Sequence, residues 1–303
     1  MLKLGVLDFD TSHVVEFTKR LNHKEIANDQ WVDGAEVVIG CPGESKIMPE
    51  RIPGYTKEME KLGIKLVAKP EDMIGKVDGM LIESQEGAPH WERAQPFLEA
   101  GIPCFIDKPF TCSVADARKI IDLSERKNVP VFSSSPLRYA PELVKFGGDA
   151  KNRKVLGVLS YGPAPLNERD LERNPGLFHY GIHAVEILYT IMATGCQRVT
   201  CTLEKDSEVV TGQWKDGRLA GIRGIRKGQS DYGFLAFADS GVTHVSLSTK
   251  YIYRELLKKI VEFFQTRKSP VDVHVTLEIV AFIEAAFKSG LNHGAGETLA
   301  LQR

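Results

Sequence analysis

Short apolar runs alternate with segments of helical periodicity through the first half of the chain. The runs are apolar at nearly every position, which is typical of parallel strands covered on both faces. After the first run, apolar residues recur at helical spacing at Val14, Phe17, Leu21 and Ile26. This alternation with short connections predicts an α/β, Rossmann-like, doubly wound parallel sheet. We expect strands at 2–7, 35–40, 64–67, 77–82, 102–106 and 129–133, and further helices at 54–63, 89–100 and 113–127.

The pattern changes after about residue 135. Strand-like runs now follow one another directly, and turns such as Lys215-Asp-Gly and Asp239-Ser-Gly separate them, as in antiparallel hairpins. We expect strands at 155–161, 197–204, 207–214, 218–226, 232–239 and 242–249, and helices at 252–267 and 274–289. The second half therefore predicts an α+β domain with an open, mainly antiparallel sheet. The predicted domains are 1–135, Rossmann-like and dinucleotide-binding, and 136–303, for substrate and oligomerisation.

Composition narrows the class of protein. A chain of 303 residues is typical of two domains. The net charge of −1 gives no electrostatic signal for nucleic acid or for an anionic membrane. No apolar run approaches the roughly 18 residues that span a bilayer, and the N-terminus enters a strand without the features of a signal peptide. The five cysteines form no Cys-x-x-Cys pair, which indicates free thiols and a cytoplasmic protein.

Lys108 follows directly on the strand expected at 102–106 and precedes Pro109. Proline blocks continuation of the strand, so the lysine lies at its carboxyl end. Ligands of open α/β sheets bind just beyond that edge. Lys108 is therefore a candidate catalytic residue, and the alternative is an ordinary exposed loop lysine.

Three side chains of the second half recur at helical spacing: His179, His183 and Glu186. We expect them on one face of a helix that begins near residue 176. A neutral imidazole is a suitable base for a hydroxyl proton near pH 7, and Tyr180 lies beside the pair to relay a proton or to pack. Two other interpretations stay open, a zinc site with His-x-x-x-His spacing and buried histidines that only donate structural hydrogen bonds.

These segments together resemble the Gfo/Idh/MocA oxidoreductase family. The family has Glu-Lys-Pro where this chain has Asp107-Lys108-Pro109, and a histidine opening a helix where His90 stands. Its Asp-x-x-x-His matches His179 to His183, with histidine in place of the aspartate. The resemblance implies that Lys108 contacts nicotinamide and substrate, that His183 acts on the substrate hydroxyl, and that the open sheet forms a homodimer or homotetramer. It also implies that Glu83 and Ser84, after the strand expected at 77–82, face a nicotinamide ribose.

The glycine-rich dinucleotide fingerprint is missing. In the family register the three glycine positions hold Asp8, Asp10 and His13. Two carboxylates there would repel a pyrophosphate, although Thr11 or Ser12 could cap the helix and donate to it, and a protonated His13 would offset some charge. The two aspartates are otherwise expected to cap the helix and face solvent. The resemblance implies NAD or NADP as the cofactor, and the choice between them stays open because the loop after the second strand carries no clear acidic or basic marker.

The sequence favours an NAD(P)-dependent oxidoreductase that transfers hydride between a nicotinamide and a hydroxyl of a sugar or polyol-like small molecule. The predicted site residues include no metal ligands. Two alternatives stay open: a non-catalytic ligand-binding or regulatory relative that has lost the cofactor, and a metal-assisted lyase or hydrolase using His179 and His183. Fold alone does not decide among them.

Overall fold

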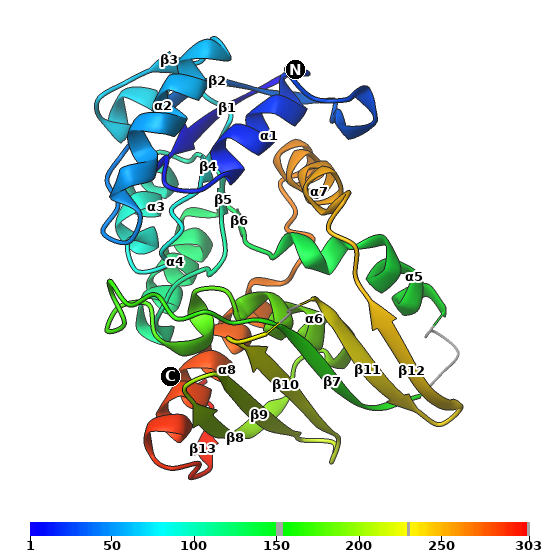
Figure 1. Cartoon of the computed structure of the whole chain (residues 1–303). Helices are drawn as coiled ribbons and strands as arrows, with labels where there is room; N and C mark the ends of the chain where they lie inside the picture. Colours follow the sequence, from blue (N-terminus) through cyan, green and yellow to red (C-terminus); the bar gives the residue numbers. More distant parts are fainter. Residues whose placement is uncertain (150–153, 229–230, 302–303) are drawn as a thin grey trace. The chain divides into compact units, whose positions relative to one another are not determined.

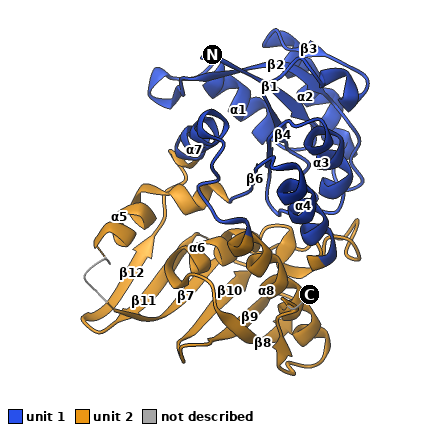
Figure 2. Cartoon of the chain, turned by 180° about the vertical axis from the view of Figure 1, so that it is seen from behind, with its two compact units in different colours: residues 1–111, 115–134, 253–273 blue, residues 112–114, 135–252, 274–303 orange. Residues whose placement is uncertain are grey.

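The computed structural model describes residues 1–149, 154–228 and 231–301. Contacts between residues divide the chain into two compact units (Figure 2). Unit 1 comprises residues 1–111, 115–134 and 253–273, and unit 2 comprises residues 112–114, 135–252 and 274–303. The predicted domain ranges, 1–135 and 136–303, differ from these units mainly in the segment 253–273.

Unit 1 is built on a six-stranded sheet in the order β3-β2-β1-β4-β5-β6, and all its strand pairs are parallel. The doubly wound parallel sheet expected from the alternating pattern is confirmed. Every residue of β4 and β5 is buried, which explains their unbroken apolar runs. The strands are β1 (Leu2–Leu7), β2 (Ala35–Cys41), β3 (Lys65–Leu66), β4 (Gly79–Ile82), β5 (Cys104–Ile106) and β6 (Val131–Phe132).

The helices of unit 1 lie between these strands along the chain, apart from one that returns from much later (Figure 1). They are α1 (His13–Leu21), α2 (Ile52–Lys61), α3 (His90–Glu99), α4 (Val114–Lys127) and α7 (Ile252–Thr266), with 3-10 helices η1 (Asn28–Gln30), η2 (Pro49–Arg51) and η3 (Pro70–Met73).

Helix α7 belongs to unit 1 because its aromatic face completes that core. The ring of Phe263 packs 5.7 Å from that of Phe132 in β6, and Tyr253 packs against Phe17 of α1. The backbone of Gly79 in β4 lies so close to Phe264 that a Cβ there would be 2.4 Å from the ring. Strand β4 and α7 therefore approach more closely than any residue but glycine allows.

Unit 2 contains a seven-stranded sheet in the order β12-β11-β7-β10-β9-β8-β13. Its pairs are antiparallel except β10 with β7, so the expected open, mainly antiparallel sheet is confirmed. The strands are β7 (Val155–Pro163), β8 (Cys196–Glu204), β9 (Ser207–Trp214), β10 (Leu219–Ile225), β11 (Gly233–Ala238), β12 (Gly241–Ser246) and β13 (Glu297–Thr298). The helices are α5 (Pro141–Asp149), α6 (Ile182–Met192) and α8 (Val273–Leu291), with 3-10 helices η4 (Pro136–Tyr139) and η6 (Gly176–Phe178).

One face of this sheet is covered and the other carries exposed apolar side chains. Helix α6 packs on β7 and β10, and burial alternates along β9 as expected for a sheet with one covered face. Apolar residues on the other face remain exposed on three neighbouring strands: Leu156, Leu159, Leu219 and Phe237. Within the described ranges, no helix has the length and apolar character needed to cross a membrane.

The contact between Gly79 and Phe264 gives a test of how α7 seats on unit 1. Gly79→Ala should destabilise the protein by about 1–3 kcal/mol, because the added methyl group overpacks the interface. The matched control is Gly147→Ala in α5, where a Cβ meets no atom within 4 Å and the change should stabilise the helix by about 0.5–1 kcal/mol. Denaturant unfolding measures both, and equal stability of Gly79→Ala and the parent chain would contradict this packing.

Candidate functional site

Asp8 follows β1 directly and is buried, contrary to the expectation of a solvated loop residue. Its φ of 66° lies in the left-handed region that asparagine and aspartate tolerate best after glycine. The carboxylate accepts hydrogen bonds from Arg93 Nε at 2.9 Å and from the Ser84 hydroxyl. Burial raises its pKa, against the opposing effect of Arg93. The side chain fits only because position 43 is glycine, where a Cβ would lie 1.8 Å from Asp8 Oδ1.

Asp10 is also buried and partnered inside the protein rather than exposed. Its Oδ1 accepts the backbone N–H of Gln85 at 2.9 Å. Burial raises the pKa of Asp10 to about 6, against hydrogen bonds from Ser45 and from the Gln85 N–H. Ser12 stands at the N-cap of α1 without a side-chain capping bond, and Thr11 Oγ1 accepts only a long hydrogen bond from the His13 N–H, at 3.4 Å.

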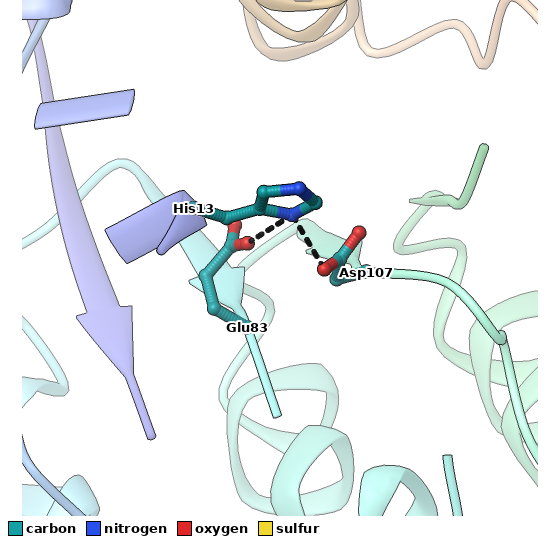
Figure 3. A group of neighbouring side chains, drawn as sticks. All are labelled: His13, Glu83 and Asp107. Atoms are coloured by element: carbon teal, nitrogen blue, oxygen red, sulfur yellow. Dashed lines mark hydrogen bonds and ion pairs between the residues drawn. The ribbon is translucent and has the colours of Figure 1, made fainter. Parts of the chain in front are cut away.

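His13, Glu83 and Asp107 form a buried group at the carboxyl edge of the sheet (Figure 3). His13 Nδ1 lies 2.7 Å from Asp107 Oδ2 and 3.7 Å from Glu83 Oε2. Burial acts to lower the pKa of His13, but the Asp107 carboxylate raises it well above its usual value. Burial raises the pKa of Glu83 to about 7. Although burial alone would raise it, His13 and Lys108 hold the pKa of Asp107 below its ordinary value.

The turn after β5 carries Lys108, which is buried. Asp107 Oδ1 accepts the Lys108 backbone N–H at 2.8 Å, and the Lys108–Pro109 peptide bond is cis. His90 opens α3 as expected, and its ring joins two loops: Nδ1 lies 2.9 Å from the carbonyl of Pro109 and Nε2 lies 3.1 Å from that of Ser84. Burial lowers the pKa of His90. The structure thus brings Ser84, His90 and the lysine turn together.

A cavity of about 580 Å³ opens at the same edge of unit 1, beyond the ends of β2 and β3. The loop after β2 supplies Gly43 and Glu44, and α3 supplies Arg93. Other lining residues come from both strand ends: Cys41, Pro42, Leu66, Val67, Ala68 and Pro70. The volume lies in the range of small-molecule and cofactor sites.

In unit 2 the sequence predicts a helix that begins near residue 176, and this predicted start is wrong. Residues 176–178 form a 3-10 turn, and α6 begins only at Ile182, so His179 precedes the helix that carries His183 and Glu186. Pro175 and Gly176, with a φ of 55°, interrupt regular helix geometry there. The three side chains therefore do not share one helix face.

His183 and Glu186 are instead held by the segment that follows β6. His183 Nδ1 lies 2.7 Å from the Ser135 hydroxyl, and Glu186 accepts the Ser135 backbone N–H at 3.2 Å. Arg138 Nε donates to Glu186 at 2.8 Å. Both carboxylate oxygens of Glu186 are therefore engaged by Ser135 and Arg138.

His179 lies beside the Asn174 amide, 3.4 Å from its nitrogen, and the ring of Tyr180 packs edge-on against both histidines. Among residues 1–149, 154–228 and 231–301, the one group of three side chains with donor atoms close enough to share a metal ion is His13, Glu83 and Asp107. The zinc interpretation of the His179 and His183 spacing is therefore not favoured.

Sequence reasoning missed the partners that hold these groups. Ser135 and Arg138 could have been found, because a Ser-Ser-Ser-Pro stretch predicts a capped turn and Arg138 follows in it. Arg93 gave no signal, since an arginine in the middle of a helix is ordinary. Its pairing with Asp8 spans 85 residues of sequence.

Comparisons with known proteins agree with this arrangement. Residues 46–135 match a family model described as "Oxidoreductase family, NAD-binding Rossmann fold", named for Gfo, Idh and MocA. The D-apiose dehydrogenase of Paraburkholderia graminis is 26% identical over 181 residues, which are 55% of this chain and 45% of that protein. The match thus spans less than half of this curated relative.

Two solved structures share the fold over nearly the whole chain. GenD2 from gentamicin A biosynthesis, in complex with NAD, has a TM-score of 0.79 and 15% identity, covering 98% of this chain and 96% of that one. A putative myo-inositol dehydrogenase from Sinorhizobium meliloti has a TM-score of 0.73 and 17% identity, covering 99% and 100%. The resemblance to the Gfo/Idh/MocA oxidoreductase family is therefore confirmed: residues 46–135, which include the lysine turn, match its family model, and the fold of the two solved structures extends over nearly the whole chain.

Proposed function

We propose that this chain is an NAD(P)-dependent dehydrogenase that acts on a hydroxyl group of a sugar or polyol-like small molecule. The observation that carries the proposal is the position of Lys108. It leaves β5 at the edge where β1 and β4 diverge to opposite halves of the sheet, the point at which doubly wound folds bind their ligands. The family and its sugar dehydrogenase relative support the same reaction class.

The cavity beyond β2 and β3 fits the adenosine half of a dinucleotide. It lies next to the first βα loop, as expected for this class of site, and Glu44 and Arg93 offer an acceptor and a donor along its wall. NAD and NADP stay alternatives, because the wall carries both an acid, Glu44, which suits the ribose hydroxyls of NAD, and a base, Arg93, which suits the extra phosphate of NADP.

The two aspartates at the glycine positions are compatible with a nearby pyrophosphate because each has internal partners. Arg93 neutralises Asp8, and the raised pKa of Asp10 reduces its charge at mildly acidic pH. Paired aspartate side chains thus stand where the family has glycine. Thr11 and Ser12 lie near the N-terminus of α1, where the binding of a phosphate is favoured.

Oxidation of a hydroxyl requires a base for its proton and a hydrogen-bond donor for the developing negative charge. A bound nicotinamide would supply the hydride acceptor. We assign the base to His183, through Nε2 in the tautomer whose Nδ1–H donates to Ser135, and the donor to Lys108. Tyr180 packs edge-on against both His183 and His179, which makes these two side chains, Tyr180 and His179, the further candidates beside the proposed base.

The first test combines binding and turnover. Thermal unfolding with NAD⁺, NADH, NADP⁺ and NADPH identifies the cofactor, which is then used with a panel of sugars and polyols. Lys108→Met should lower kcat/KM about 100- to 1,000-fold through loss of one oxyanion donor, and His183→Gln about 100- to 10,000-fold through loss of the base.

The matched control is Lys119→Met, an exposed lysine of α4 that pairs with Asp116 and should leave kcat/KM unchanged. Failure of all four nucleotides to shift the unfolding midpoint would reject the dinucleotide. Full turnover in Lys108→Met would remove that residue from the mechanism.

The raised pKa of Asp10 predicts a pH-dependent stability. Because its folded pKa of about 6 exceeds the ordinary 3.8, the folded chain binds this proton more tightly, and the stabilisation present below pH 4 is lost as pH rises through 6. Asp10→Asn keeps the acceptor for Gln85 and should stabilise the protein at pH 7.5 by at most about 3 kcal/mol, with no gain at pH 4.

Denaturant unfolding of both chains at the two pH values measures this difference. Asp33→Asn, at a side chain that is 94% exposed, serves as control and should show no pH-dependent gain. A gain for Asp10→Asn that is the same at pH 4 and pH 7.5 would argue against a raised pKa.

We further propose that a second copy of the chain covers the open face of the unit 2 sheet, giving a homodimer or homotetramer. Exposed apolar residues there line a shallow groove of about 290 Å³, among them Leu159, Leu219 and Phe237. A contiguous apolar patch on a sheet face is typical of an interface.

Leu159→Lys should weaken self-association at least tenfold, because it places a charge in that patch. Light scattering after size-exclusion chromatography measures the assembly. Val144→Lys, at an exposed valine of α5, is the control. A monomeric parent chain, or an unchanged oligomer in Leu159→Lys, would reject this interface.

The thiols support a reducing compartment such as the cytoplasm. All five cysteines are free, and four of them are buried. Buried thiols without disulfides are typical of proteins that are not exported to an oxidising environment.

A further inference from the structure

The segments that follow the parallel strands β1, β4 and β5 place His13, Glu83 and Asp107 next to one another. Strand β4 pairs with both neighbours, and the register aligns Leu7 with Ile82 and Ile82 with Ile106. Glu83 and Asp107 each follow an aligned residue, so their side chains emerge next to each other. His13 begins α1 after the β1 loop and turns its Nδ1 toward both carboxylates (Figure 3).

The imidazole is held in this direction by packing on two sides. Its ring stacks on Phe17 at a centroid distance of 4.9 Å, and Tyr253 of α7 meets it edge-on at 4.9 Å. Asp107 is fixed by the Lys108 backbone N–H at its other oxygen. The donor atoms are therefore pre-positioned, which reduces the ordering cost of binding an ion.

In the described part of the chain, Glu83 is the member of the group without a hydrogen bond, and it forms an ion pair with His13. Its side chain is fully buried, and neither carboxylate oxygen has a hydrogen-bond partner among the described residues. One Nδ1–H can reach Asp107 at 2.7 Å, but it lies 3.7 Å from Glu83, beyond a hydrogen bond. Burying a carboxylate without a hydrogen-bond donor costs free energy. A cation bound by all three side chains would offset this cost.

We propose that His13, Glu83 and Asp107 bind a divalent transition-metal ion through Nδ1 and one oxygen of each carboxylate. One donor atom from each residue lies within 4.8 Å of the others. Ligands at about 2.0–2.2 Å from an ion lie about 3–3.5 Å apart, a spacing that the two measured separations, 2.7 and 3.7 Å, bracket. Small side-chain shifts would complete the coordination.

The donor set indicates which ions bind. Two carboxylate oxygens with one imidazole suit Zn²⁺ or Mn²⁺, whereas Mg²⁺ prefers oxygen ligands and retains its waters. The positive charge of Lys108 acts to lower the pKa of both Glu83 and Asp107, so a bound ion would interact with two carboxylates that also face an ammonium group. The inference stands independently of the proposed dehydrogenase activity, because its ligands and its test involve no nucleotide.

The test is direct binding to the chelator-treated full chain. Isothermal titration with ZnCl₂ and with MnCl₂ should give one ion per chain, confirmed by elemental analysis after dialysis. MgCl₂ should bind at least tenfold more weakly. Absence of stoichiometric binding by both Zn²⁺ and Mn²⁺ would overturn the site, and equal binding of Mg²⁺ and Mn²⁺ would remove His13 from it.

Two variants locate the ion. Glu83→Gln keeps the side-chain shape and should weaken binding at least tenfold, whereas the double variant His179→Gln and His183→Gln should bind as the parent does. The reverse result would move the metal to unit 2 and reject the proposal. If Glu83→Gln fails to fold, His13→Gln takes its place and should also weaken binding at least tenfold, and binding equal to that of the parent would reject the site.

Discussion

Burial of charge at the carboxyl edge of the unit 1 sheet constrains the rest of this molecule. Asp8, Glu83 and Asp107 all leave strands that are covered on both faces, so their carboxylates enter a region with little water. Each needs a partner from another segment: Arg93 for Asp8, and His13 for Asp107. These pairs tie the first βα loop to α3 and to the lysine turn, next to the cavity beyond β2 and β3.

The element pattern was readable from sequence because periodicity reports local burial. All six strands of unit 1 and strands β7 to β12 of unit 2 lie within a few residues of their predicted positions, as β4 and β9 illustrate, whereas the two-residue β13 was not predicted. Helix α5 and the turn η4 were missed, because Pro136 and Pro141 divide a short stretch in which apolar spacing is weak. The start of α6 was wrong because Pro175 and Gly176 alter the backbone without changing the apolar pattern.

The sequence singled out Lys108 and His183 as candidate site residues, but it did not predict the contacts that hold the candidate site together. Lys108 and His183 carry recognisable local motifs. The environment of Asp8 and Asp10 does not, since burial and pairing depend on Gly43, Ser84 and Arg93, which are distant in sequence. From sequence alone, an aspartate that follows a strand is predicted to be exposed to solvent unless its partner is known. Long-range ion pairs leave no periodic trace, and this is the physical reason that the acidic loop was misread as exposed.

Because α7 belongs to unit 1, the core of that unit can be completed only late in synthesis. Residues 253–273 complete the core of unit 1, yet the ribosome supplies them only after all the strands of unit 2 except β13. Until then Phe132 and Gly79 lack the aromatic cover of Phe263 and Phe264. Domains usually fold one after another as they emerge, but here the N-terminal unit must wait for about nine-tenths of the chain. Unit 1 therefore completes its core only after most of unit 2 has been synthesised.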